Sequence, residues 1–313
     1  MSSIIQLLTT LFLFNVAADA SRPVQGKIPV ERATVYRHGG SSAAECTPIY
    51  SREDSIRVME LLAYAASLPD SVSVPVSVAR RLTGVPYVAS VLERGVTARG
   101  LKERMVVNLR ELDCTTLVET VTAVTLCRRA GVKSFEGYVG MLEKLRYRDG
   151  CNSGYVSRLH YFTDWIKDNG KMGFVRETNC SGIPFNSVQT ISLNYMTTHP
   201  QSYRALRENA SLVPLIRKTE KALNGLQFRY IPKNMVAHSS VRKFVRDGDI
   251  IAITCRKAGL DIAHVGFAVW HEDGLHLLNA SSIHHKVVEE PMTLSEYLKK
   301  HPSHTGIRVV RIL

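Results

Sequence analysis

Apolar residues recur with helical spacing in the first half of the chain. The segment Ser51–Asp70 opens on a capping serine, carries acidic residues in its first turn and ends near a proline. A second helix is predicted to begin after Asp113, a good N-cap residue, and to end at Gly131. We expect further helices over residues 135–145 and 200–223. The apolar positions that define the two clearest helices are Val58, Leu61, Leu62, Ala65, Leu117, Val118, Val121, Val124 and Thr125.

The C-terminal part of the chain changes from helical spacing to short β-branched runs. Turn signals such as Asp273-Gly274 separate these runs, which is typical of strands in hairpins. Helices followed by strands favour an α+β fold in which an antiparallel sheet packs on the helices. The predicted strands cover residues 248–255, 263–270, 275–282 and 307–313.

The middle of the chain, residues 148–194, follows neither spacing. It is rich in Gly, Tyr and Asn and reads as too polar and broken for a core element. We expect it to be a loop-rich insertion, either a subdomain or a long functional loop. A length of 313 residues allows one large domain or two smaller ones. We predict a single domain over residues 21–313.

The N-terminus carries an apolar run that ends in small residues. The motif Ala18-Asp19-Ala20 fits signal-peptidase cleavage before Ser21, although no Lys or Arg precedes the run. We therefore expect residues 1–20 to be a signal peptide and the mature protein to be exported, periplasmic or extracellular. A buried N-terminal helix is the alternative. No later stretch is long and apolar enough to predict a membrane span.

The formal net charge of +12 raises the question of a nucleic-acid partner. The Lys and Arg residues are dispersed along the chain, with no zinc-finger spacing, RGG run or basic helix. We therefore expect no nucleic-acid binding. An exported basic protein would instead meet anionic polymers of the cell envelope, and a solvated basic surface without a partner is the alternative.

Six cysteines occur, and Cys114 occupies the most informative position among them. No CxxC pair exists and the spacings are irregular, so neither a zinc cluster nor a dense disulfide framework is predicted. Cys127 lies within an apolar segment and reads as a core residue. Cys114 falls in the first turn of the predicted helix, where unpaired N–H groups and the helix dipole favour a thiolate. It could be a nucleophile, although a cysteine at a helix start is more often structural.

The strand-rich half supplies partners for a nucleophilic cysteine. His264 opens an apolar strand, and Asn279 should lie roughly opposite it on the next strand of the hairpin. An imidazole can take the thiol proton and return it to a leaving amine. A side-chain amide beside it can orient the ring, as in a Cys-His-Asn triad. His264 could also be a structural histidine; His271 and His276 lie on the same hairpin without opening an apolar strand.

Several long segments resemble one known family. They are "LDCTTLVE", "YRDGCNSGYVSRLHYFTDWI", "NYMTTHP", "GDIIAITCRKAGLDIAHVGFAVWHEDGLHLLNASS" and "PMTLSEYLKKHPSHTGIRVVRI". They are similar to the N-acetylmuramoyl-L-alanine amidase-like family of exported bacterial proteins, a branch of the NlpC-type papain-like cysteine peptidases. The resemblance spans residues 53–313. It implies a papain-like core, with a catalytic helix packed on an antiparallel sheet and with helical and loop-rich insertions.

The resemblance also implies roles for individual residues. Cys114 matches the nucleophile and His264 the general base, while Asn279 stands where many relatives carry His. Tyr87 matches the tyrosine beside the cysteine, although the segment "PYVAS" lacks the glycine pair usual after it. Asp113 matches the acidic residue before the nucleophile. It could cap the helix only or also contact substrate.

Three residues of the loop-rich middle are further candidates for substrate binding. Arg158 could hold a carboxylate of a peptide stem by a bidentate contact. Tyr155 and His160 lie near it in the sequence and could contact a sugar or peptide face. A structural arginine that ties down a long loop is an equal alternative.

The resemblance implies a cysteine amidase that cleaves the bond between N-acetylmuramic acid and L-alanine in peptidoglycan fragments. We expect no metal, because the sequence has no HExxH motif, and no cofactor. We expect a monomer. The rival functions are an NlpC-type endopeptidase that cuts after γ-D-glutamate and a non-catalytic wall-binding protein.

Overall fold

The computed structural model describes residues 47–97 and 102–313, so the predicted signal peptide lies outside the described residues. The helices are α2 (Arg52–Ser67), α3 (Val74–Arg81), α4 (Cys114–Arg129), α5 (Phe135–Arg146), α6 (Phe162–Lys171), α7 (Tyr195–Thr198), α8 (Arg204–Glu208), α9 (Val213–Leu223) and α10 (Leu294–Lys300). The strands are β1 (Val175–Thr178), β2 (Ser187–Thr190), β3 (Gln227–Pro232), β4 (Ile250–Cys255), β5 (Ile262–Trp270), β6 (Leu275–Ser281), β7 (Lys286–Glu289) and β8 (His304–Ile312). The predicted α+β fold is confirmed.

The two clearest helices form where their caps predict them. The Ser51 hydroxyl accepts a hydrogen bond from the Asp54 amide, and the Asp54 carboxylate accepts one from the Ser51 amide, so a capping box starts α2. Asp113 and Thr116 form the same reciprocal pair at the start of α4. Gly131 follows α4 with a φ of 68°, the left-handed conformation that a helix C-terminus favours.

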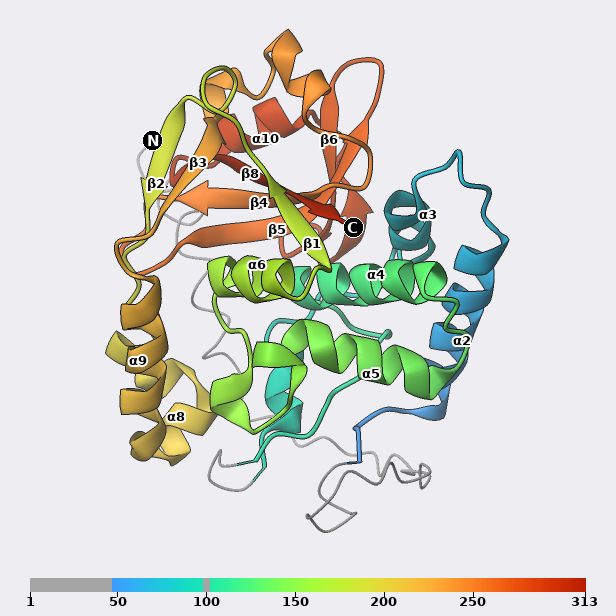
Figure 1. The fold of residues 1–313 in the computed structure, drawn as a ribbon, viewed down its shortest axis with the longest axis vertical. Helices are drawn as coiled ribbons and strands as arrows, with labels where there is room; N and C mark the ends of the chain where they lie inside the picture. Colours follow the sequence, from blue (N-terminus) through green and yellow to red (C-terminus); the bar gives the residue numbers. More distant parts are fainter. Residues whose placement is uncertain (1–46, 98–101) are drawn as a thin grey trace, which may run out of the picture.

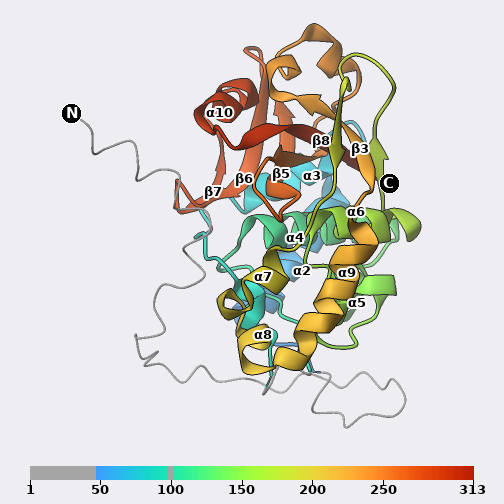
Figure 2. The same cartoon turned by 90° about the vertical axis from the view of Figure 1, so that its left-hand side faces the viewer.

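The sheet is antiparallel and runs in the order β2-β3-β8-β4-β5-β6-β7, with β1 also paired to β8. Alternate residues of β4 face opposite sides. Ile250 and Ala252 join the larger apolar core with α2, α4 and α5, whereas Ile251 and Ile253 join a second core with α10. Figure 1 shows α4 and α6 against the sheet and α5 beyond α4. Figure 2 shows α10 on the other side of the sheet. Helix α4 is thus enclosed by other elements, which is why Cys127 is buried in the core, as predicted.

The expectation that residues 148–194 lack a core element is wrong. Helix α6 lies within this segment, and its Trp165 is fully buried in the larger core, stacked on Phe162. Strand β1 in the same segment pairs with β8 of the main sheet. The polar residues of α6 are accommodated because they find partners: Asn169, for example, donates to the carbonyl of Leu145. That residues 148–194 are an insertion stays a prediction.

The single helix expected over residues 200–223 is also wrong. The chain forms a 3-10 turn, then α8, then a second 3-10 turn at Ala210–Leu212, and then α9. The helix is interrupted at Asn209, because the backbone there is extended and the Asn209 side chain accepts a hydrogen bond from the Ser211 amide. Pro214 is the second residue of α9, in the first turn, where its missing N–H is harmless. These pieces surround a third apolar cluster, which includes Met196, Leu206 and Ile216.

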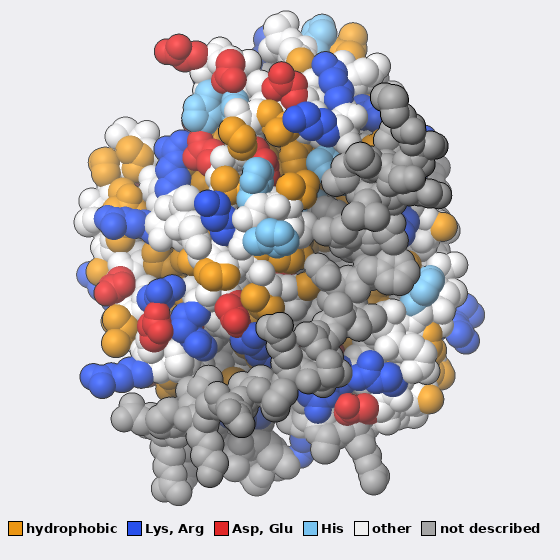
Figure 3. Space-filling model, turned by 180° about the vertical axis from the view of Figure 1, so that it is seen from behind, with side chains coloured by type: hydrophobic (Ala, Val, Ile, Leu, Met, Phe, Trp, Pro, Cys, Tyr) orange, Lys and Arg blue, Asp and Glu red, His pale blue; other side chains and the backbone are white. Residues whose placement is uncertain are grey.

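The face of the molecule in Figure 3 does not concentrate positive charge among the residues that the structure describes. On the face in Figure 3, Lys and Arg side chains are scattered among acidic, apolar and uncharged ones. Within residues 47–97 and 102–313, none of the helices combines the length and the apolar character that a membrane span needs.

Candidate active site

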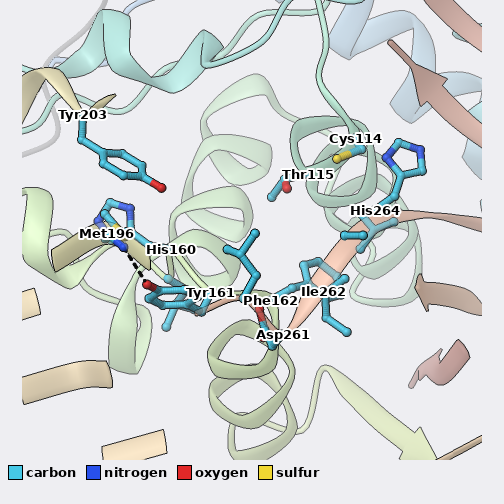
Figure 4. Close-up of a pocket in the computed structure, with 14 residues that line it drawn as sticks. Cys114, Thr115, His160, Tyr161, Phe162, Met196, Tyr203, Asp261, Ile262 and His264 are labelled. Atoms are coloured by element: carbon cyan, nitrogen blue, oxygen red, sulfur yellow. Dashed lines mark hydrogen bonds between the residues drawn. The ribbon is translucent and has the colours of Figure 1, made fainter. Parts of the chain in front are cut away.

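A pocket of about 150 Å³ lies where the start of α4 meets β5 and the helical segment α7–α8. Cys114 and His264 line one end of it, and His160, Met196 and Tyr203 line the other (Figure 4). Cys114 is the first residue of α4, as predicted, and its thiol is free and half-buried. The pocket therefore brings together the cysteine and the histidine that the sequence singled out.

The protonation state of Cys114 differs from the expectation of a thiolate. Burial raises the pKa of the Cys114 thiol to about 12, and the Asp113 carboxylate acts in the same direction. Hydrogen bonds from the backbone of Val265 and from Thr115 oppose this rise but do not cancel it. The helix N-terminus stabilises a thiolate, but desolvation destabilises it more, because burial penalises the charged form directly. The Cys114 thiol is therefore neutral at rest, and it would need a base to act as a nucleophile.

His264 reaches the pocket from β5 beside an irregularity in the strand pairing. His264 pairs with Ile253 and Ile262 with Thr254, so Ala263 is an extra residue between them. Such bulges redirect neighbouring side chains. Burial lowers the pKa of His264, which the hydrogen bond to Asn279 and the charge of Glu290 only partly oppose. A neutral imidazole next to a neutral thiol is the state from which a general base acts.

Asn279 is fully buried on β6 and hydrogen-bonds to His264, with 2.9 Å between Nε2 and Oδ1. The register pairs Phe267 with Leu278, which sets Asn279 one step further along, opposite Gly266. A side chain at Gly266 would put its Cβ 3.0 Å from the Cβ of Asn279. The glycine thus leaves the space through which Asn279 reaches His264 diagonally across the hairpin. The three candidates Cys114, His264 and Asn279 lie together.

Tyr87 and Asp113 lie beside Cys114 without lining the pocket. The segment of Tyr87 pairs with that of Leu112, just before the cysteine. Burial raises the pKa of Tyr87, and a thiolate at Cys114 or the Asp113 carboxylate would raise it further, so its hydroxyl stays protonated. Asp113 caps α4 through its bonds to Thr116. Burial also raises the pKa of Asp113.

Of the three candidates from the loop-rich middle, only His160 lines the pocket. Its Nε2 lies 2.8 Å from the carbonyl oxygen of Tyr155, and burial holds its pKa well below the usual range. The Tyr155 ring is buried against His160 and under the Arg158 guanidinium. Arg158 is buried and pairs with Glu93 and, at 3.5 Å, with Glu103. This is the arrangement of an arginine that ties a loop to the fold, and substrate contact by Arg158 and Tyr155 stays a prediction.

The structure adds residues that sequence reasoning missed. Tyr203 and Met196 reach the pocket from the helical segment, and Glu290 binds Asn279 from beyond β7. Gly266 was visible in the sequence as a glycine inside a strand, which often marks close backbone approach. Tyr203 and Glu290 carried no local signal, because their roles depend on segments far away in the chain.

Neither a metal cluster nor a disulfide is found in the described part of the chain. Among its residues, no group of three or more His, Cys, Asp or Glu could hold a metal ion. The cysteines that the structure describes, Cys114, Cys127, Cys151, Cys180 and Cys255, are free thiols.

Fold and pocket together define an α+β protein with a cysteine and a histidine at one pocket and an asparagine bound to that histidine. A family model described as N-acetylmuramoyl-L-alanine amidase-like matches residues 77–307. The chain belongs to this family.

Several solved structures share the fold of this chain, and one of them is named an N-acetylmuramoyl-L-alanine amidase. An N-acetylmuramoyl-L-alanine amidase from Bacteroides uniformis is 40% identical, with a TM-score of 0.69 over 76% of this chain and 97% of its own. A protein from Bacteroides fragilis described as a candidate xylanase is 39% identical, with a TM-score of 0.68 over 75% of this chain and 99% of its own. A Legionella pneumophila protein at 22% identity shares the fold, with a TM-score of 0.63 over 83% of this chain and 95% of its own. No curated protein matches the chain.

Proposed function

We propose that this protein is an exported cysteine amidase that cleaves the amide between N-acetylmuramic acid and L-alanine in peptidoglycan fragments. The observation that carries the proposal is the shared pocket of Cys114 and His264, with Asn279 bound to the imidazole. The family and the Bacteroides uniformis amidase support the choice of bond. A helix that presents a cysteine to a histidine on an antiparallel sheet is also consistent with the papain-like NlpC-type core that we propose.

Bond cleavage begins with proton transfer, because the thiol is neutral at rest. Nδ1 of His264 takes the proton of Cys114 as the sulfur attacks the amide carbonyl carbon, which gives a tetrahedral oxyanion. The backbone N–H groups at the first turn of α4, including that of Cys114, would donate to this oxyanion. As the intermediate collapses, the imidazolium returns its proton to the amine of L-alanine, which leaves. The sugar part remains as a thioester on Cys114.

In the hydrolysis of the thioester, water is the nucleophile and the sulfur of Cys114 is the leaving group. Water gives a proton to His264 while its oxygen attacks the thioester carbon, and the sulfur leaves with the proton from the imidazolium. The products are the lactyl carboxylic acid of the sugar and the free thiol. Asn279 would hold the imidazole in one orientation through both steps.

A glycosidase mechanism, which the name of the Bacteroides fragilis relative suggests, fits the pocket less well. Glycosidases use two carboxyl groups that flank the scissile bond, about 5 to 9.5 Å apart. Among the residues that line the pocket, Asp261 is the one carboxylate, and it accepts a hydrogen bond from the Thr163 amide at 2.8 Å. The pocket lining therefore supports nucleophilic chemistry at an amide.

The test is product analysis on a soluble disaccharide-peptide. We expect the wild-type protein to release intact stem peptide and free disaccharide, and Cys114→Ala to release neither, as seen by mass spectrometry. The matched control is Cys151→Ala, which removes another free but exposed thiol and should retain activity. Release of L-Ala-D-Glu would identify the endopeptidase instead. Binding of wall material without any product would identify a non-catalytic protein.

A further inference from the structure

Behind the Cys114–His264 pair lies a buried carboxylate that the steps above do not use. Glu290 is 2% exposed and follows β7, where its backbone amide donates to the carbonyl of Leu277. Its backbone oxygen lies 2.8 Å from Nδ1 of His276. Both contacts hold the main chain of Glu290 against β6, so the position from which its side chain extends is fixed.

Each oxygen of the Glu290 carboxylate has its own partner. Oε1 accepts from Nδ2 of Asn279 at 3.0 Å, and Oε2 lies 3.1 Å from Nε2 of His284. His284 is partly exposed, with 34% of its side-chain surface accessible. The result is one continuous chain of contacts, His264–Asn279–Glu290–His284, that runs from the pocket to the surface. A carboxylate with both oxygens engaged cannot rotate without breaking a buried bond.

The orientation of the Asn279 amide follows from this chain. An ionised carboxylate only accepts hydrogen bonds, so the NH₂ group of Asn279 must face Glu290. The amide oxygen must then face His264, and Nε2 of His264 must carry the proton that it donates. In this tautomer Nδ1 is the basic nitrogen, which is the atom that the proposed reaction requires. With an apolar residue at position 290, the amide could turn over and favour the other tautomer.

We propose that Glu290 is a positioning residue that selects the basic nitrogen of His264 by fixing the orientation of the Asn279 amide. The proposal rests on the proposed function for its kinetic consequence only. The tautomer of His264 can be measured without any substrate, so failure of the two ideas can be told apart.

The kinetic test is a double-mutant cycle between Glu290 and Asn279. We expect Glu290→Met to lower kcat on the order of 10- to 100-fold with little change in KM, by analogy with the residues that orient metal-bound histidines. Asn279→Leu should lower kcat by a similar factor. Because Glu290 acts through Asn279, the double variant should be no worse than Asn279→Leu alone. Losses that multiply in the double variant would overturn the proposal.

The direct test is the ¹⁵N NMR spectrum of the histidine side chains, with His264→Gln used to assign the His264 signals. We expect the Nε2–H tautomer of His264 in the wild type and a mixture of tautomers in Glu290→Met. Unchanged His264 signals in the variant would overturn the proposal even if kcat falls. Glu290→Gln, which keeps the shape and can either accept or donate, should give a smaller loss of kcat. It also keeps the proposal testable if the methionine variant does not fold.

The matched control lies one residue away. Glu289 ends β7 and pairs with Arg80 and His271 at the surface, whereas the side-chain hydrogen bonds of Asn279 go to His264 and Glu290. We expect Glu289→Met to leave kcat and the His264 signals unchanged. A pH profile adds a second readout, because the charge of Glu290 raises the pKa of His264. The acid limb of kcat/KM should therefore move to lower pH in Glu290→Gln but not in Glu289→Gln.

Discussion

Two buried polar networks of this protein are built in opposite ways. The first joins His264, Asn279 and Glu290, whose bonds connect residues 15 and 11 positions apart in one hairpin region. The second joins Arg158 to Glu93, 65 positions away, and to Glu103. The first network reaches the pocket through His264. The second does not line the pocket, and its guanidinium lies between the two carboxylates of Glu93 and Glu103.

If the proposed function holds, this difference separates a network that prepares chemistry from one that holds the fold. In the proposed reaction the pocket network orients an imidazole whose basic nitrogen can still change its protonation state. The Arg158 network leaves little of the guanidinium for a ligand, since Glu93 and Glu103 already neutralise it. A buried charge is therefore informative about function only when its partners are known.

The largest expected effect comes from breaking the Arg158 network. Arg158→Met leaves Glu93 and Glu103 without their cation in a buried place, so we expect the free energy of unfolding to fall by about 3–5 kcal/mol. Urea unfolding followed by circular dichroism measures it. The matched control is Arg94→Met, which breaks a pair with Glu111 that is 48% and 33% exposed and should cost less than about 1 kcal/mol.

Activity data on the same variant sharpen the comparison. If Arg158 binds the carboxylate of a stem peptide, KM should rise strongly in the folded Arg158→Met protein. We expect instead an almost unchanged KM and a loss of stability. A raised KM at unchanged stability would show that Arg158 binds substrate. The two networks would then not differ in the way described above.

The next effect comes from closing the space that Asn279 uses. In Gly266→Ala the new Cβ would lie 2.6 Å from the carbonyl oxygen of Leu278 and 3.0 Å from Asn279, so the hairpin must shift. We expect kcat to fall on the order of tenfold or more, because a small displacement of an orienting group has a large kinetic cost. Gly140→Ala is the control, since its Cβ meets no atom within 4 Å and a helical alanine is favourable. Equal kcat in both variants would show that Asn279 does not need this approach.

The smallest expected effect is in the pH dependence. Burial lowers the pKa of His264 below its usual 6.5, and the imidazole must be neutral to accept the thiol proton. Activity should therefore persist as the pH falls through 6.5 and decline only below it. Because the pKa of Cys114 is about 12, no alkaline limb from thiol ionisation is expected between about pH 8 and 10. A kcat/KM profile with an acid limb at or above 6.5 would contradict the buried neutral pair.

Much of the pocket network was predictable because its signals are local. A capping aspartate followed by an apolar period places Cys114 at the start of α4, and one tight turn brings Asn279 near His264. The diagonal offset and the need for Gly266 were not predictable, since they depend on the strand register. The thiolate expectation failed for a related reason: desolvation depends on which elements cover Cys114.

The sequence by itself determined the clearest helices, the antiparallel hairpins and the position of the candidate nucleophile. Capping residues, side-chain period and turn residues act over a few positions, so they can be read without the rest of the chain. Only the tertiary structure decided that Trp165 belongs to the core, that Arg158 is neutralised and that Glu290 supports Asn279. Burial and pairing of polar groups depend on partners that are distant in the sequence. Their free energies are therefore set when the whole chain packs.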